Sequence, residues 1–374
     1  MRSALVHRLV GLIVAGGLLI QPASGAPRQS AVAAGPQTFA GLVASLSEPG
    51  GYFDTDNLIS NERSYLHVIP ALRQLAPQAA QTGVYVGVGP DQNFSYIAHL
   101  RPALAIIVDI RRDNMLLHLL FKALFAESAT RVDYLAMLTG RAPPVRAEGK
   151  PSGTVDTILK QIDGAGRLDT AGLSALQSRL MTRITGFGVP LMDRDRATIL
   201  AFHRRFVADG LMLRFNSAGR APQYDYPTHR DLLVEVDRQG VHRSFVATEE
   251  DFQFVKAMHA ADRIVPIVGD IAGSEALKAV AKYLGDNGRQ VTAFYTSNIE
   301  QYLFRNGAFA SFITNLGRLP RQPRSLIIRS AFPSGSASAP ILAGYNSASL
   351  TQPIQTLLDG YAKGQFHQYW ELIR

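Results

Sequence analysis

The sequence contains no cysteine. This absence excludes disulfides, thiol catalysis, lipid attachment through a cysteine and zinc sites built from thiolates. Nine histidines are present, but none stands in the HExxH or HxH spacing that is typical of a metal site. The GxSxG elbow of serine hydrolases and the GK[ST] ending of a P-loop are absent as well. The chemistry of this chain therefore has to be sought outside these classes of site.

Dense clusters of positive charge are also missing. The formal net charge is +8, but the arginines are scattered, without a dense run or interleaved aromatic residues. Nucleic-acid binding therefore receives little support, and a small-molecule ligand is the better expectation. Hydrophobic residues make up 47% of the 374 residues, which is enough to bury one large core.

The N-terminal region lacks an apolar run of membrane-spanning length. Leu9 to Ile20 is apolar over twelve residues, fewer than the roughly 20 that cross a bilayer. Arg2 and Arg8 precede this run and the small residues of QPASGAP follow it, which is the layout of a secretory signal peptide. We therefore expect residues 1–25 to be a signal peptide. The protein would then be exported, periplasmic or secreted, with no stable membrane span after cleavage.

Strand and helix patterns alternate over much of the remaining chain. We expect residues 26–49, which are rich in Ala, Gly, Ser and Gln, to form a flexible leader, or alternatively a first weak helix, and residues 50–374 to form one structured domain. The first helix pattern of this domain is interrupted by Pro70, which should start, kink or divide it. Apolar strand patterns follow at VYVGV, ALAIIVDI, RIVPIVGD, VTAFYTS and SLIIRSAF, with helical patterns between them and C-terminal helices over LTQPIQTLLDGYAKGQFHQYWELI.

Residues 126–262 interrupt this alternation. A Pro/Gly-rich connector and helical patterns such as DRATILAFHRRFVADG and TEEDFQFVKAMHAAD indicate a largely helical insertion. The alternation on either side predicts an α/β fold, a Rossmann-like doubly wound and mostly parallel sheet.

Ligands of such sheets bind at the carboxyl ends of the strands, so the residues found there are the candidates for a site. In GVYVGVGPDQN, Gly87 and Gly89 allow the backbone to approach a ligand closely. Asp109 ends the second strand and is placed to accept hydrogen bonds from a ribose. Asp270, after the third strand, is suited to accept a hydrogen bond from an adenine amino group. The fourth strand runs into SNIE, Ser297 to Glu300.

At these positions the chain resembles the class I S-adenosylmethionine-dependent methyltransferases. In that class a Gly-rich first turn, an acidic end of the second strand, an acidic residue after the third and a polar motif after the fourth line one cofactor groove. The resemblance covers roughly residues 80–125 and 262–332. NLISNERSYLHVIPAL, VGVGPDQNFSYIAHLRP, IIVDIRRDN, HRSFVATEEDF and AFYTSNIEQYLF are in addition similar to a family of uncharacterised, exported bacterial proteins with this core. The resemblance implies S-adenosylmethionine as the cofactor.

Two positions depart from the pattern of that class. Tyr85 stands in the first strand where an acidic residue usually holds the methionine ammonium, and Asp91 replaces the third glycine of the turn. A carboxylate at Asp91 would repel a pyrophosphate, which disfavours NAD and FAD, but it is suited to take over the contact with the ammonium group.

Three further residues are candidates for catalysis or for covering the cofactor. The resemblance implies that Asn298 and Glu300 orient or deprotonate a nucleophile, with Glu300 as a general base. Glu62, in SNE ahead of the first strand, is a candidate lid residue over the cofactor, or alternatively part of an ordinary helix start.

For Asp109 and Asp270, a structural role is an alternative to a role in ligand binding. Asp109 would pair with Arg111 or Arg112 in a salt bridge, and Asp270 would cap the following helix, although Ser274 is better placed for that cap.

Three functions remain open at this point. The first is a methyltransferase of unknown acceptor, and the second is an exported, non-catalytic binding or scaffold protein that keeps the Rossmann-like fold. The third is a nicotinamide-dependent oxidoreductase, which Asp91 disfavours. S-adenosylmethionine is not expected outside the cytoplasm, so the predicted export signal favours the second function.

Overall fold

The computed structural model describes residues 37–55, 57–143, 153–217, 225–332 and 340–373. The predicted signal peptide, residues 1–25, and the leader up to residue 36 lie outside these described residues. Thr38–Arg374 forms one unit, and the following description concerns that unit.

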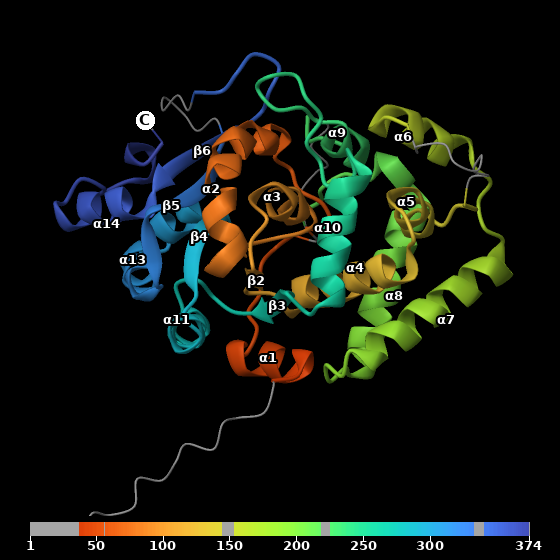
Figure 1. Ribbon diagram of the computed structural model, residues 1–374, viewed down its shortest axis with the longest axis horizontal. Coiled ribbons are helices and arrows are strands. Elements are labelled where there is room, and N and C mark those ends of the chain that lie inside the picture. Colours follow the sequence, from red (N-terminus) through yellow and green to blue (C-terminus); the bar gives the residue numbers. More distant parts are fainter. Residues whose placement is uncertain (1–36, 56, 144–152, 218–224, 333–339, 374) are drawn as a thin grey trace, which may run out of the picture. The chain divides into compact units, whose positions relative to one another are not determined.

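A six-stranded sheet in the order β3-β2-β1-β4-β5-β6 forms the centre of the unit (Figure 1). Neighbouring strands from β3 to β5 are parallel, and β6 is antiparallel to β5. The chain reverses its direction of winding between β1 and β4, which is where doubly wound folds bind their ligands. The α/β fold with a mostly parallel sheet is therefore confirmed. The strands are β1 (Gly83–Gly87), β2 (Leu104–Asp109), β3 (Ile264–Val268), β4 (Gln290–Ser297), β5 (Arg321–Ala331) and β6 (Ala348–Pro353).

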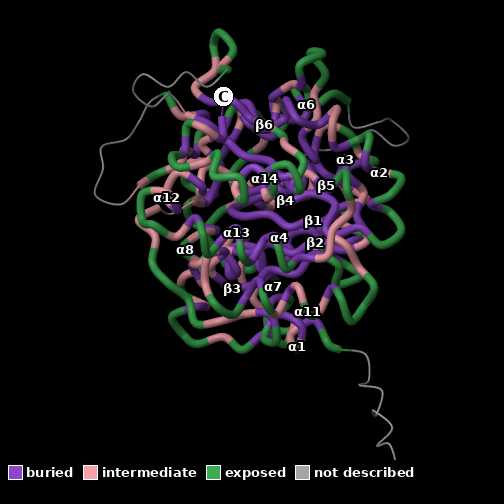
Figure 2. The backbone as a smooth tube through the Cα atoms, turned by 90° about the vertical axis from the view of Figure 1, so that its left-hand side faces the viewer, coloured by how far each residue is buried: buried purple, intermediate pink, exposed green. Residues whose placement is uncertain are grey.

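The central strands are short apolar runs that are buried along their whole length. Every residue of β1 and of β3 is buried, as is all of β2 before Asp109. Such runs form parallel strands because helices cover both faces of the sheet. Figure 2 shows these buried strands at the centre, with the partly exposed helices around them.

Helices pack around the sheet and also form the segments that precede and follow it. They are α1 (Phe39–Leu46), η1 (Arg63–Val68), α2 (Ile69–Thr82), α3 (Gln92–Leu100), α4 (Arg112–Glu127), α11 (Ala276–Asp286), α12 (Ile299–Arg305), α13 (Phe309–Arg318), α14 (Ile354–Ala362) and η3 (Tyr369–Glu371). Pro70 lies in the first turn of α2, where its missing N–H costs no helical hydrogen bond, so it starts this helix. Within the described residues, no helix combines the length and apolar character needed to span a membrane.

The predicted insertion is helical in its described part. Residues 126–262 contain the end of α4 and then α5 (Arg131–Leu138), α6 (Val155–Gly164), α7 (Thr170–Gly186), α8 (Asp193–Asp209), η2 (Gly210–Met212), α9 (His229–Leu233) and α10 (Glu249–Ala260). None of the six strands of the sheet comes from this part of the chain.

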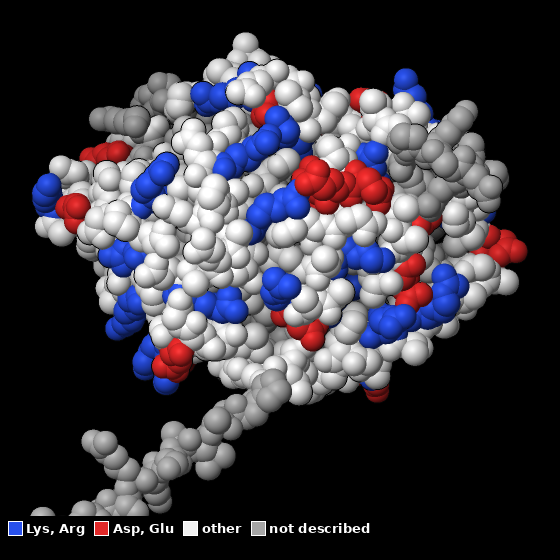
Figure 3. Space-filling view, viewed as in Figure 1, with Lys and Arg blue, Asp and Glu red and all other residues white. Residues whose placement is uncertain are grey.

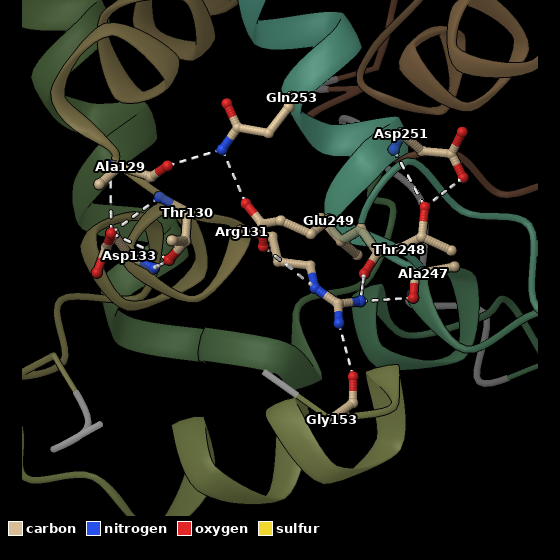
Figure 4. Close-up of polar contacts among 11 residues, drawn as sticks. Ala129, Thr130, Arg131, Asp133, Gly153, Ala247, Thr248, Glu249, Asp251 and Gln253 are labelled. Atoms are coloured by element: carbon tan, nitrogen blue, oxygen red, sulfur yellow. Dashed lines mark hydrogen bonds and ion pairs between the residues drawn. The ribbon is translucent and has the colours of Figure 1, made fainter. Parts of the chain in front are cut away.

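A buried arginine ties segments of this insertion together. Arg131 donates hydrogen bonds to the carbonyl oxygens of Val246 at 2.7 Å, Ala247 at 2.5 Å and Gly153 at 2.6 Å (Figure 4). Only 4% of Arg131 is exposed, and burial lowers the pKa of its guanidinium. Because its bonds go to backbone carbonyls of separate segments, Arg131 has a structural role.

Both ends of the domain differ from their predicted bounds. The structure begins before Gly50, because α1 lies within the predicted leader and buries Phe39, Leu42, Val43 and Leu46. These residues follow helical spacing and give α1 an apolar face that packs near β3. At the other end, residues 350–353, where the C-terminal helices were predicted to begin, belong to β6. Pro353 ends this strand, and α14 begins at the next residue.

Candidate ligand-binding site

A cavity of about 820 Å³ lies at the carboxyl ends of the parallel strands. Its volume is within the range of pockets that hold small molecules and cofactors. Residues at or just after the ends of β1, β2, β3 and β4 line one side, including Gly89, Asp109, Asp270 and Ser297. The rest of the lining comes from residues 52, 53, 55, 57 and 60–62, from Gln92, from α12 and the residues just after it, from two pairs in the insertion, and from Phe332 and Asn346. The pairs are Phe215 with Ser217 and Asp225 with Tyr226.

The turn after β1 is held by a single asparagine. The amide nitrogen of Asn93 donates to the carbonyl oxygens of Val88 at 2.9 Å and Pro90 at 2.7 Å, while its amide oxygen accepts from the Tyr85 hydroxyl at 2.6 Å. Gly89 lines the cavity with φ +81°, a conformation that strains any residue with a Cβ. This turn therefore presents backbone to the cavity, as the sequence predicted for Gly89.

Gly87 has a packing role instead of a place in the cavity. A Cβ at this position would meet the Asn93 Oδ1 atom at 2.1 Å and the Tyr85 hydroxyl oxygen at 2.6 Å. The glycine is required because these two side chains fill the space beside it. Gly87 is not among the residues that line the cavity.

Asp91 does not line the cavity either. Its carboxylate accepts a hydrogen bond from Nε2 of His229 in α9 at 3.1 Å, and only 4% of Asp91 is exposed. Nearby, His118 donates from Nε2 to the carbonyl oxygen of Gly89 at 2.9 Å, and burial lowers the pKa of His118 to about 4. Asp91 therefore joins the turn to the insertion and is not presented to a ligand in this cavity.

Asp109 faces the cavity and is paired with Arg111. Oδ1 accepts from the backbone N–H of Arg111 at 2.9 Å and from its Nε at 3.0 Å, and Oδ2 accepts from Nη2 at 2.8 Å. The Nη1 atom of Arg111 also donates to the carbonyl oxygen of Thr55 at 2.8 Å. A carboxylate oxygen has two lone pairs, so Oδ2 keeps one that Arg111 does not use.

Asp270 also lines the cavity and does not cap α11. Its Oδ1 atom accepts from the backbone N–H of Ala272 at 2.8 Å and closes a tight turn. The expectation that Ser274 caps the helix was wrong. Instead, Glu48 accepts hydrogen bonds from the backbone N–H groups of Asp270 at 2.6 Å and Ala276 at 3.1 Å. A residue from the predicted leader thus supports both Asp270 and the start of α11.

Glu62 is the most enclosed acid of the cavity. Glu62 directly precedes η1. Its carboxylate accepts hydrogen bonds from three hydroxyl groups, those of Tyr295 at 2.5 Å, of Ser297 and of Ser330. Tyr295 in turn accepts from Nε2 of Gln92 at 3.0 Å. Burial raises the pKa of the Glu62 carboxyl, and the three hydroxyl donors oppose this shift in part. The sequence placed Glu62 either on a lid or at a helix start, and in the structure it occupies a helix start that faces the cavity.

Backbone strain accompanies this arrangement. Ser297 has φ +55° and Asn57 has φ +47°, although neither is glycine, and both line the cavity. Residues held in this region cost free energy that the surrounding structure has to offset, and they cluster at functional sites.

The two candidates from SNIE are separated by the turn into α12. Asn298 lines the cavity, whereas Glu300 is absent from its lining and is fully buried. Arg329 of β5 donates to Glu300 from Nε at 2.5 Å and from Nη2 at 3.1 Å. Glu300 is thus held in a buried ion pair away from the cavity.

Apart from Asn298, the aromatic and amide side chains of the cavity were not predicted from the sequence. Phe53 and Tyr302 meet edge to face at 5.1 Å between ring centres, and Phe215 and Tyr226 do so at 5.5 Å. The period-2 and period-3.6 patterns do not single these residues out, because they lie in loops or on a partly exposed helix. The amides are Asn57, Asn61, Gln92, Asn298, Gln301, Asn306 and Asn346.

Basic and acidic side chains are interspersed on the face in Figure 3, without a large area of one sign. No group of three or more His, Asp or Glu side chains within the described ranges is arranged to hold a metal ion.

The sheet order and the cavity at its point of reversal define a Rossmann-like α/β protein with a cavity at the strand ends. Residues 57–144 and 208–366 match the family described as a domain of unknown function, DUF7790, and the chain belongs to this family. The match includes all six strands and leaves out most of α6 to α8. From Asn57 onward, every residue that lines the cavity lies within the match. No curated protein matches the chain.

Proposed function

We propose that this chain is an S-adenosylmethionine-dependent methyltransferase-like protein that binds its cofactor in the strand-end cavity. One observation carries the proposal: Gly89, Asp109 and Asp270 reach the same cavity from the ends of the three neighbouring strands β1, β2 and β3. A glycine turn and two carboxylates in this order suit a nucleoside with a ribose diol and an amino group.

The charge of the cavity supports a cationic ligand. Its lining includes four carboxyl side chains, those of Glu62, Asp109, Asp225 and Asp270, and two guanidinium groups, those of Arg111 and Arg305. S-adenosylmethionine carries a positive sulfonium, which an excess of carboxylates stabilises, whereas the pyrophosphate of NAD or FAD would be repelled. The same balance disfavours a nicotinamide-dependent oxidoreductase.

The residues of the chain divide between holding the cofactor and handling the acceptor. Gly89, Asp109 and Asp270 would hold the nucleoside, and the cofactor supplies an electrophilic methyl group when it is bound. Asn298 lines the cavity and would orient the acceptor. Glu62, rather than Glu300, is the general base of this proposal, because it lines the cavity and burial raises its pKa, which makes it a stronger base than an ordinary carboxylate.

A second function is favoured by a different observation. Asp109 is paired with Arg111, Asp91 with His229 and Glu300 with Arg329, so three of the acids predicted for the site have partners within the protein. An exported, non-catalytic binding protein that keeps the fold and uses the cavity for another small molecule accounts for these pairs. Export rests on residues 1–25, and sequencing the N-terminus of the protein purified from its host would test it by a processed end near Ala26.

Calorimetric titration with S-adenosylhomocysteine separates the two functions. We expect it to bind the wild-type chain and to bind Asp270→Asn about tenfold more weakly, because a charged hydrogen-bond acceptor is lost. Asparagine can still accept the Ala272 N–H, so the turn is retained. Glu275→Gln, an exposed position outside the cavity, is the control and should bind like the wild type. Absence of binding to the wild-type chain would remove the basis of the methyltransferase proposal.

A further inference from the structure

Three hydrogen-bond acceptors at one end of the cavity have capacity that the protein leaves unused. They are the Glu62 carboxylate, the amide oxygen of Gln92 and the amide oxygen of Asn346, and all three residues line the cavity. The two amide oxygens are buried and have no hydrogen-bond partner in the described structure. Buried acceptors without a donor cost free energy, which a bound ligand can recover.

The orientation of the Gln92 amide follows from its neighbours. The Tyr295 hydroxyl donates its single proton to Oε2 of Glu62 at 2.5 Å. The same hydroxyl must then accept from Gln92, which places the NH₂ group of Gln92 toward Tyr295 at 3.0 Å. The amide oxygen of Gln92 is therefore the atom left without a partner, on a residue that is only 6% exposed.

The orientation of the Asn346 amide follows in the same way. Its Nδ2 atom lies 3.5 Å from the carbonyl oxygen of Asn61, which can only accept. The Oδ1 atom of Asn346 therefore points elsewhere and has no partner. Asn61 directly precedes Glu62 in the chain, so Asn346 and Glu62 lie at the same end of the cavity.

Glu62 contributes the third acceptor. Its Oε2 atom receives hydrogen bonds from Tyr295 and Ser330, and its Oε1 atom receives one from Ser297. One lone pair of Oε1 therefore remains for a ligand. A carboxylate as enclosed as this one, with 1% of the residue exposed, favours a cationic partner over a neutral one.

We propose that this end of the cavity binds a primary ammonium group of the acceptor, with its three N–H donors directed to Glu62, Gln92 and Asn346. A hydroxyl group offers one donor and would leave two acceptors unpaired, and a neutral amide offers two donors without a charge. This inference rests on the proposed function in so far as it assigns the amine to the methyl acceptor. Before such a nitrogen can act as a nucleophile, one N–H bond has to break, and the proton then passes to Oε1 of Glu62.

The rest of the cavity indicates what the amine is attached to. Phe53 with Tyr302 and Phe215 with Tyr226 present partly exposed rings to the same space. An isolated antiparallel bridge between Thr55 and Ser217 joins the two segments that carry Phe53 and Phe215. Rings of this kind stabilise apolar and aromatic groups, so an arylalkylamine matches both parts of the cavity.

Benzylamine and benzyl alcohol test the proposal, because they share a ring and differ in the donor group. Calorimetric titrations of the full chain should show benzylamine binding at least about tenfold more tightly than benzyl alcohol, as charge-assisted hydrogen bonds are the stronger ones. Glu62→Gln should abolish this preference, and Asn346→Leu should reduce it by roughly threefold. Glu275→Gln, the same chemical change at an exposed position, should retain it. Circular dichroism would verify that each variant is folded.

Equal affinity for the two compounds, or a preference that Glu62→Gln leaves intact, would overturn the proposal. Repeating the benzylamine titration with saturating S-adenosylhomocysteine distinguishes the acceptor from the amino-acid end of the cofactor. Continued binding supports an acceptor amine, and displacement would overturn that assignment. If S-adenosylhomocysteine itself does not bind while the benzylamine preference persists, the methyltransferase proposal fails and the ammonium site is supported.

Discussion

Removing the charge of Glu300 should destabilise the fold without weakening ligand binding. The Glu300 and Arg329 side chains are 0% and 2% exposed, and two hydrogen bonds, of 2.5 and 3.1 Å, join them. Glu300→Gln would leave the Arg329 guanidinium charged and buried, with Gln352 at 2.9 Å as a neutral neighbour. Breaking a buried pair in this way costs about 3–5 kcal/mol. The free energy of unfolding should fall by that amount.

Urea unfolding followed by circular dichroism measures this loss in a double-mutant cycle. Arg329→Met alone should also destabilise the protein, because it leaves the Glu300 carboxylate buried and unpaired. The double variant should recover much of the loss, since an uncharged pair of similar volume avoids the burial of a lone charge. S-adenosylhomocysteine should bind Glu300→Gln as it binds the wild type, at a temperature where both are folded. Wild-type stability of Glu300→Gln combined with loss of binding would refute this reasoning and return Glu300 to the functional site.

Three further predictions concern stability. Burial lowers the pKa of His118 to about 4 in the folded protein, whereas in the unfolded chain it is about 6.5. As the pH falls from about 6.5 to about 4, His118 is therefore protonated in the unfolded chain but not in the folded protein. Over that window this residue alone should lower the free energy of unfolding by about 3 kcal/mol, and a pH series of urea titrations with no decline would contradict this. Gly89→Ala should lower the free energy of unfolding by about 1–2 kcal/mol, because Gly89 has φ +81°. Gly285→Ala, on the open surface of α11, should raise it by roughly 0.5–1 kcal/mol. Equal effects of the two substitutions in thermal melts would argue against the turn geometry. Burial raises the pKa of the Glu62 carboxyl in the folded protein. The free energy of unfolding therefore decreases as the pH rises through this folded-state pKa, because the buried carboxyl has to ionise. The melting temperature of Glu62→Gln should therefore rise relative to that of the wild type as the pH increases, and a relative fall would count against a costly buried carboxylate.

The fold was predictable because each central strand is a short apolar run followed by a turn. VYVGV, ALAIIVDI and RIVPIVGD are buried along nearly their whole length, and that pattern depends only on local sequence. The positions of Gly89, Asp109 and Asp270 at the cavity followed from the same pattern, since the carboxyl ends of parallel strands meet at one edge of the sheet.

The roles of the remaining acids depended on partners far away in the sequence. Arg329, which pairs with Glu300 of α12, lies on β5. His229, which pairs with Asp91, lies on α9 in the insertion. No local pattern reports such contacts. Strand β6 was missed for a related reason, because its ladder with β5 and not its own apolar pattern makes it a strand.

The enclosed acceptors of the cavity could not be predicted from spacing either. Gln92 and Asn346 are recognisable only when the hydrogen bonds of their neighbours are known, and Glu62 only when the hydroxyl groups of Tyr295 and Ser330 are placed beside it. Glu48, which supports Asp270, lies in a segment whose composition indicated a flexible leader.

A crystal structure of the protein grown with saturating S-adenosylhomocysteine tests the central claim most directly. The account predicts that the nucleoside occupies the strand-end cavity, against the backbone of Gly89 and within hydrogen-bond distance of Asp109 and Asp270. An empty cavity at saturating ligand, or a ligand bound away from the carboxyl ends of β1, β2 and β3, would contradict it.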